Sequence, residues 1–214
     1  MAASDGGTGD ATPPTTVIFD LGAVLIDWNP RYLYRSLIDD PDEMERFLAE
    51  VTTQAWNHEQ DRGRTWRAAV DELVAVHPQH AHLIRAYHER WPEMLGGPIQ
   101  DTVDLLAELR DAGVELYALS NWSTETYPIA LERYSFLRWF RGVVISGEVG
   151  AAKPEPAAYL ALVERYGVVP EASVFIDDQP ANVEAARELG FRAIRFTDAA
   201  SLRDELEALG LLRS

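Results

Sequence analysis

The sequence predicts an α/β fold, in which a doubly wound parallel sheet carries an inserted, all-helical cap subdomain. Two observations predict it. Short apolar runs alternate with amphipathic helical stretches along most of the chain, and alternation of this kind is typical of a parallel sheet covered by helices on both faces. One segment, from about Trp28 to Met94, breaks the alternation and contains helical patterns without a clear strand.

Five apolar runs are the predicted strands. Each has the length of a strand, and four of them lead directly into polar residues. The runs are Val17–Phe19 before Asp20, Val114–Leu119 before Ser120, Val143–Ile145 before Ser146, Val174–Ile176 before Asp177, and Ala193–Phe196.

The helices between these strands are predicted from spacing and from their ends. Asp101–Ala112 places Val103, Leu105, Leu106 and Leu109 on roughly one side. Asp101 is the expected N-cap, and Gly113 is well placed to end the helix. Asn182–Leu189, followed by Gly190 and the last strand, repeats the pattern. The predicted core is therefore Rossmann-like.

The inserted segment contains four predicted helices. They are Arg31–Ile38, Asp42–Val51, Thr65–Val76 and Gln79–Arg90, and prolines separate them. We assign residues 28–96 to the helical cap and residues 15–27 and 97–214 to the α/β core. The small, polar residues 1–14 are expected to be a disordered tail.

Composition narrows the possible functions. The 214 residues are 47% hydrophobic and 25% charged, include no cysteine, and carry 19 basic against 35 acidic residues, a net charge of −16. The charge argues against a nucleic-acid partner, which requires concentrated positive charge. No apolar run is long enough to span a membrane. The absence of a secretory signal and of cysteine is compatible with the cytoplasm. The oligomeric state is left open.

Polar residues capable of one chemistry follow the strands. Asp20, Ser120 with Asn121, Lys153, and Asp177 with Asp178 all come at or after predicted strand ends. Ligands bind outside the carboxyl ends of the strands in an open parallel sheet, so these residues can converge. A carboxylate can attack phosphorus, a hydroxyl can hold phosphoryl oxygens, a lysine can neutralise charge, and further carboxylates can bind Mg²⁺.

Four segments resemble the motifs of the haloacid dehalogenase superfamily. They are VIFDLGAVL, LSNWS, AAKPEPAAY and VFIDDQPANVEAARELG, and they occur in the family's order with a helical insertion where some members carry a cap. The resemblance covers nearly the whole chain after the tail. It implies a Mg²⁺-dependent hydrolase of this superfamily, and most readily a phosphatase that acts on a small phosphorylated metabolite.

The resemblance also implies roles for individual residues. Asp20 would be the nucleophile and a metal ligand, and Ser120 would bind phosphate with Asn121 beside it. Lys153 would stabilise charge and contact the substrate. Asp178 would bind the metal directly, Asp177 directly or through water, and Gly22 through its backbone carbonyl.

Gly22 departs from the phosphatase pattern. Phosphatases of this superfamily usually have an aspartate two residues after the nucleophile, which protonates the leaving group and then activates water. Three interpretations follow: a phosphatase that manages without this residue, a metal-independent 2-haloacid dehalogenase, or a catalytically weak protein that binds a phosphorylated ligand. Adjacent carboxylates at Asp177 and Asp178 favour the first, because a cation relieves their repulsion.

Further residues have two open interpretations each. Asp27, Trp28 and Asn29 either enclose the substrate or form a hinge of the cap. The polar cluster of the cap either lines the underside of the cap or is solvated. The tryptophans of the cap either form the cap's core or stack on a ligand. The cluster is His58, Glu59, Asp61, Arg62 and Arg64, and the tryptophans are Trp56, Trp66 and Trp91.

Overall fold

The computed structural model describes residues 13–213, so the predicted tail lies outside the described residues as far as residue 12. Its central feature is a five-stranded parallel sheet in the order β5-β4-β1-β6-β7. The strands are β1 (Thr16–Phe19), β4 (Glu115–Ser120), β5 (Gly142–Ile145), β6 (Ser173–Asp177) and β7 (Arg192–Arg195). All five predicted strands are present, and the strand before Asp20 is the central one.

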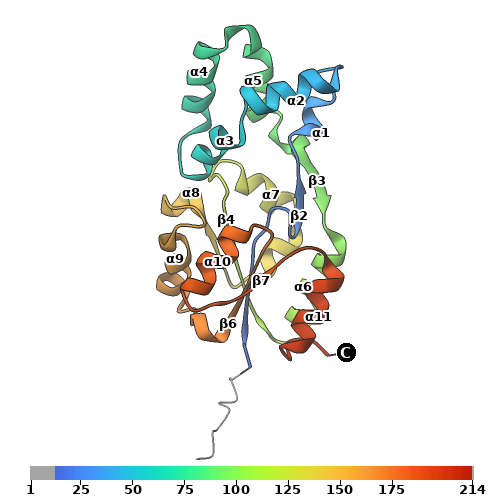
Figure 1. Cartoon of the computed structure of the whole chain (residues 1–214), viewed down its shortest axis with the longest axis vertical. Helices are drawn as coiled ribbons and strands as arrows, with labels where there is room; N and C mark the ends of the chain where they lie inside the picture. The colour runs from blue at the N-terminus through green and yellow to red at the C-terminus, as the bar shows by residue number, and fades with distance from the viewer. Residues whose placement is uncertain (1–12, 214) are drawn as a thin grey trace, which may run out of the picture.

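Both faces of the sheet are buried under helices. Successive residues of β1 alternate between two hydrophobic clusters: Val17 and Phe19 belong to one, and Ile18 belongs to the other. The first cluster includes residues of α6 (Gln100–Asp111), α7 (Tyr127–Arg133) and α11 (Ala199–Ala208), and the second includes residues of α9 (Pro156–Tyr166) and α10 (Pro180–Glu188). Figure 1 shows α6 and α11 on one side of the sheet and α9 and α10 on the other. This confirms the predicted doubly wound core.

The start of α6 corrects one expectation. Its N-cap is Ile99, and Asp101 lies in the first turn, where it makes a favourable interaction with the helix dipole without capping the helix. The other end agrees with the prediction: Ala112 is the C-cap, and Gly113 follows with a φ of +81°.

Five helices precede the return of the chain to the core, and they form the upper part of the molecule in Figure 1. In three of them, a side chain that precedes the helix (Asp40, Thr53 or Thr65) accepts a hydrogen bond from the first turn. The helix α3 was not among the predicted helices. The five are α1 (Arg31–Tyr34), α2 (Pro41–Glu50), α3 (Gln54–Asp61), α4 (Trp66–Val76) and α5 (Ala81–Glu89).

The segment that joins the helices to the core is not helical, and it lies at the two ends of the predicted helical insertion. Antiparallel strands β2 (Ile26–Trp28) and β3 (Leu95–Pro98) form a two-stranded ribbon. A Cβ added at Gly96 would lie 2.4 Å from Asp27 Oδ2 and 2.7 Å from Tyr32, so a side chain there would displace both of these side chains. A strand of three residues and one of four that contains two glycines have too little pattern to be recognised in the sequence. We propose that the cap begins and ends within this ribbon.

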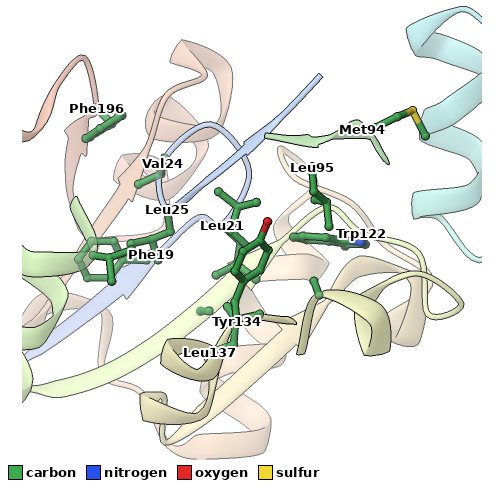
Figure 2. Packing of buried hydrophobic residues seen from close by; sticks show 14 of the residues in the cluster. Phe19, Leu21, Val24, Leu25, Met94, Leu95, Trp122, Tyr134, Leu137 and Phe196 are labelled. Atoms are coloured by element: carbon green, nitrogen blue, oxygen red, sulfur yellow. The ribbon is translucent and has the colours of Figure 1, made fainter. Parts of the chain in front are cut away.

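The ribbon is packed onto the core through buried apolar side chains. Figure 2 shows Leu21, Val24 and Leu25, which follow β1, in one cluster with Leu95 of β3 and with Trp122. The remaining elements are short: α8 (Ser146–Val149) and the 3₁₀ turns Pro78–His80, Trp91–Met94, Ser135–Trp139 and Pro170–Ala172. Within residues 13–213, no helix is both long enough and apolar enough to cross a membrane.

Candidate active site

Three neighbouring strands end in polar side chains at one edge of the sheet. Asp20 directly follows β1, Ser120 ends β4, and Asp177 ends β6. Ser120 Oγ donates a hydrogen bond to Asp20 Oδ1 over 3.0 Å, and the backbone N–H of Leu21 donates to the same oxygen. Asp20 is only 7% exposed. The strand order thus brings together side chains that are up to 157 positions apart in the sequence.

Lys153 connects two of these carboxylates. It lies in the loop between α8 and α9 and is 4% exposed, and its Nζ is 2.9 Å from Asp20 Oδ1 and 2.7 Å from Asp177 Oδ2. The loop is held by Asn121, whose amide donates to Lys153 O (3.0 Å) and accepts from Lys153 N (2.8 Å). The side chain of Asn121, predicted to bind substrate, therefore uses both ends to position the lysine loop.

The charges in this group affect one another strongly. Burial opposes the charged form of Lys153, but Asp20 and Asp177 together outweigh it, and the pKa of the lysine is raised. Burial raises the pKa of Asp20 to about 6, Lys153 works against this rise, and Asp177 adds to it. The lysine is charged at neutral pH, and its positive charge favours the ionised, nucleophilic form of Asp20.

Asp177 is fully buried and also holds the start of α10. Its Oδ1 accepts from the backbone N–H of Gln179 (2.8 Å), and both of its oxygens lie 3.0 Å from Asn182 Nδ2. Asp177 therefore has a structural role alongside any functional one. The positioning contacts of Gln179 and Asn182 were not predicted, although both residues lie within the fourth motif.

The acidic residues of this edge could hold a divalent cation. Ligand atoms of Asp20, Asp177 and Asp178 lie within 4.8 Å of one another. The contacts of Asp20 named above all involve Oδ1, which leaves Oδ2 as the oxygen that could bind a cation. Burial and then Asp177 raise the pKa of Asp178, which indicates a repulsion that a cation would relieve. An all-oxygen set with one or two available carboxylates fits the coordination preference of Mg²⁺.

A cavity of about 320 Å³ lies beside this edge of the sheet, between the core and the cap. We call its two sides the core wall and the cap wall. The core wall is formed by Asp20, Gly22, Ser120, Asn121, Trp122, Thr126, Lys153, Pro154, Gln179, Ala181 and Asn182. The cap wall is formed by Trp28, Gln54, Asn57, His58, Asp61, Trp66 and Trp91.

Gly22 leaves open space on the core wall. A Cβ added there would meet no atom within 4 Å, and its φ is not in the left-handed region, so nothing local forbids a side chain. The position where phosphatases of the resembled family carry an acid therefore has room for one but supplies none.

Among the residues with open interpretations, Trp28 lines the cavity, and its Nε1 is buried without a hydrogen-bond partner in the described part of the chain. Its neighbours make local contacts instead: Asp27 accepts from the hydroxyl of Tyr32, and Asn29 accepts from the backbone N–H of Arg31. The sequence could not separate these roles, because β2 was not predicted, and the opposite directions of its alternate side chains could not be inferred without it.

The polar cluster of the cap also divides into residues that line the cavity and residues that do not. His58 and Asp61 line the cavity, whereas Glu59 is exposed. Arg62 forms an ion pair with Glu155, and Arg64 donates to Gln60 Oε1 over 2.7 Å. The signal that could have separated them is the three-residue spacing of His58 and Asp61, which places both on one helix face.

The tryptophans of the cap belong to its hydrophobic core, and two of them also line the cavity. Trp66 and Trp91 are buried in the hydrophobic core and also line the cavity. Trp56 packs edge-on against Trp66, with ring centroids 5.6 Å apart. Trp122, which sequence reasoning did not single out, lines the cavity from the core side, and its ring centroid lies 5.8 Å from that of Trp91.

The chain is similar to proteins of a known family. The family model of the haloacid dehalogenase-like hydrolases matches residues 14–190. A phosphoglycolate phosphatase from Pseudomonas putida is 26% identical over 199 residues, which cover 87% of this chain and 70% of that protein. A chloroplast flavin mononucleotide hydrolase from Arabidopsis thaliana is 33% identical over 108 residues, half of this chain, and the match spans only 44% of that relative's length.

Among solved structures, a haloacid dehalogenase family enzyme from Bacteroides thetaiotaomicron superposes with a TM-score of 0.66 at 25% sequence identity. The match covers 86% of this chain and 95% of that one. That enzyme was crystallised in complex with magnesium and inorganic phosphate.

Proposed function

This chain belongs to the haloacid dehalogenase-like hydrolases, and from that premise we propose that it is a Mg²⁺-dependent phosphatase acting on a small phosphorylated metabolite. The observation that carries the proposal is the contact of Lys153 Nζ with both Asp20 and Asp177, beside three carboxylates that can share one cation. Relatives named as phosphatases support the reaction class.

In the proposed reaction, Asp20 attacks phosphorus and forms an aspartyl-phosphate, which water then hydrolyses. Lys153 neutralises charge on the nucleophile and on the transferring group, and the hydroxyl of Ser120 holds Asp20 or a phosphoryl oxygen. Asp20, Asp178, the carbonyl of Gly22 and, directly or through water, Asp177 would hold Mg²⁺. The bound cation would supply charge neutralisation at the phosphoryl oxygens.

The proximity of three acidic side chains favours this proposal over a metal-independent dehalogenase. Asp177 and Asp178 would add negative charge next to a carboxylate nucleophile, and Lys153 alone would have to offset all three. A cation resolves this imbalance, and a phosphorylated substrate brings further oxygen ligands to it.

The test is phosphate release from a panel of phosphorylated metabolites, measured with Mg²⁺ and with a chelator. We expect release that requires Mg²⁺ and falls to background in Asp20→Asn. Asp71→Asn is the matched control, since it changes an exposed aspartate of the cap and should retain activity.

Two outcomes would replace the proposal. Release of halide from 2-haloacids, unaffected by the chelator, would establish a dehalogenase. Stabilisation of the protein by phosphorylated ligands without any turnover would establish a binding protein.

A further inference from the structure

The core wall lacks a group that can give a proton to the leaving group. Gly22 has no side chain, Lys153 is engaged with two carboxylates, and Ser120 donates to Asp20. The cap wall faces this gap with four residues of α3, and Asp61 is the carboxylic acid among them.

Asp61 is held firmly in this position. It is the last residue of α3 and is 8% exposed. Ser146 Oγ, on the core, donates a hydrogen bond to the backbone oxygen of Asp61 and accepts one from Trp122 N (2.9 Å). The chain then turns at Gly63, where φ is +101° and an added Cβ would lie 3.3 Å from Gly147 O. The end of α3 is thus docked on the core beside the cavity.

The side chain of Asp61 has no cationic partner in the described part of the chain. Its Oδ2 accepts from Asn57 Nδ2 over 3.3 Å and lies 3.8 Å from His58 Nδ1, and neither contact involves Oδ1. The nearby Arg62 and Arg64 are paired with Glu155 and Glu72 instead.

This environment favours the protonated acid. Burial first, and then the charge of Asp20, raise the pKa of Asp61 to about 8, so the carboxyl group carries its proton at neutral pH. His58 is a weaker candidate, because burial and then Arg62 lower its pKa and leave the imidazole uncharged at neutral pH.

We propose that Asp61, supplied by the cap, is the general acid and base of the phosphatase reaction, in place of the side chain missing at Gly22. The inference rests on the proposed function and deepens it. It assigns the chemistry to two walls: the core wall attacks phosphorus, and the cap wall moves the proton.

The steps balance as follows. Asp20 forms a bond to phosphorus as the bond between phosphorus and the leaving oxygen breaks, and that oxygen takes the proton of Asp61, so an alcohol departs. Asp61, now a carboxylate, takes a proton from water as the water oxygen bonds to phosphorus and the bond to Asp20 breaks. Phosphate departs, Asp20 is again a carboxylate, and Asp61 is again an acid.

The test compares leaving groups in the Mg²⁺-loaded enzyme. For a reaction through a covalent intermediate, kcat/KM reports the steps up to release of the alcohol. An alkoxide needs a proton to leave, whereas para-nitrophenolate does not. We expect Asp61→Asn to lower kcat/KM for glycerol phosphate by about 10²–10⁴-fold and for para-nitrophenyl phosphate by less than about tenfold.

Two variants on the same helix serve as controls. Glu59→Gln removes an exposed carboxylate and should alter neither substrate's kcat/KM, and His58→Gln should not produce a loss that depends on the leaving group. Equal losses on both substrates in Asp61→Asn, or a leaving-group-dependent loss in His58→Gln alone, would overturn the inference. A wild-type enzyme that releases no phosphate from either ester would instead overturn the proposed function.

Discussion

Asp20 of the core wall shares a buried lysine with the buried carboxyl group of Asp177, whereas on the cap wall the buried carboxyl of Asp61 contacts an amide and an imidazole and, among the described residues, no cation. The same functional group is thus placed in opposite environments across one cavity. The comparison shows how two carboxyl groups can serve two roles: a compensated one stays ionised as a nucleophile, and an uncompensated one keeps a proton.

Removal of the lysine should have the largest effect. Lys153→Met leaves two buried carboxylates without their cation, and loss of one partner of a buried ion pair costs about 3–5 kcal/mol of unfolding free energy. We expect that loss in a urea titration, together with loss of phosphate release. Arg203→Met is the matched control, because its pairing with Glu108 is on the surface and should contribute less than about 1 kcal/mol.

Lys153→Arg sharpens the same prediction. Lys153 is the only lysine in the chain, and the other 18 of the 19 basic residues are arginines. A planar guanidinium cannot replace a compact ammonium between two carboxylates, so we expect this variant to be inactive as well. An active Lys153→Arg enzyme would show that positive charge alone suffices on the core wall.

An acid moved across the cavity should have the next largest effect. The space around Gly22 admits a side chain, so Asp61→Asn combined with Gly22→Asp returns a carboxyl group to the core wall. We expect kcat/KM for glycerol phosphate to recover at least about tenfold relative to Asp61→Asn alone, since general acid catalysis is commonly worth more than that. A double variant no faster than the single one would contradict this account of position 22.

A further effect is expected on how the stability depends on pH. The pKa of Asp61 is 3.8 in its ordinary environment and about 8 in the folded protein. Between these values the folded state holds a proton that the unfolded state releases, so the wild-type protein loses stability as the pH rises. The Asp61→Asn variant has no titrating group at this position and does not lose stability in this way. We therefore expect its Tm to match that of wild type near pH 4 and to exceed it by several degrees near pH 8.

Differential scanning calorimetry across this range measures the difference. The other titratable groups around Asp61 are His58, Tyr87 and Asp20, and they are present in both proteins, so most of their contribution cancels. A constant difference in Tm at every pH would mean that Asp61 is ionised in the folded state.

The core wall was predictable from the sequence, and the cap wall was not. Asp20, Ser120 and Lys153 of this wall, and Asp177 in contact with Lys153, each stand at or after a strand end, and parallel pairing forces strand ends to meet. The clustering of Asp20, Asp177 and Asp178 and the convergence on Lys153 follow from that rule. The roles assigned to these residues stay predictions.

On the cap, no comparable rule fixes which polar residue faces inward. Asp61 is one of five residues in the polar cluster of the cap, and it is buried where α3 is docked on the core through Ser146. The short ribbon of β2 and β3 escaped prediction for a related reason, because the close approach of Asp27 and Tyr32 to Gly96 follows no periodicity.

The division of labour between the two walls can be tested in one measurement. Mg²⁺-loaded Asp61→Asn is mixed with para-nitrophenyl phosphate, quenched in acid and examined by peptide mass spectrometry. The account predicts a phosphoryl group on the peptide that contains Asp20, because attack proceeds while water is no longer activated, and predicts none in an Asp20→Asn/Asp61→Asn double variant. Slow turnover without this adduct, or an adduct on another residue, would contradict it.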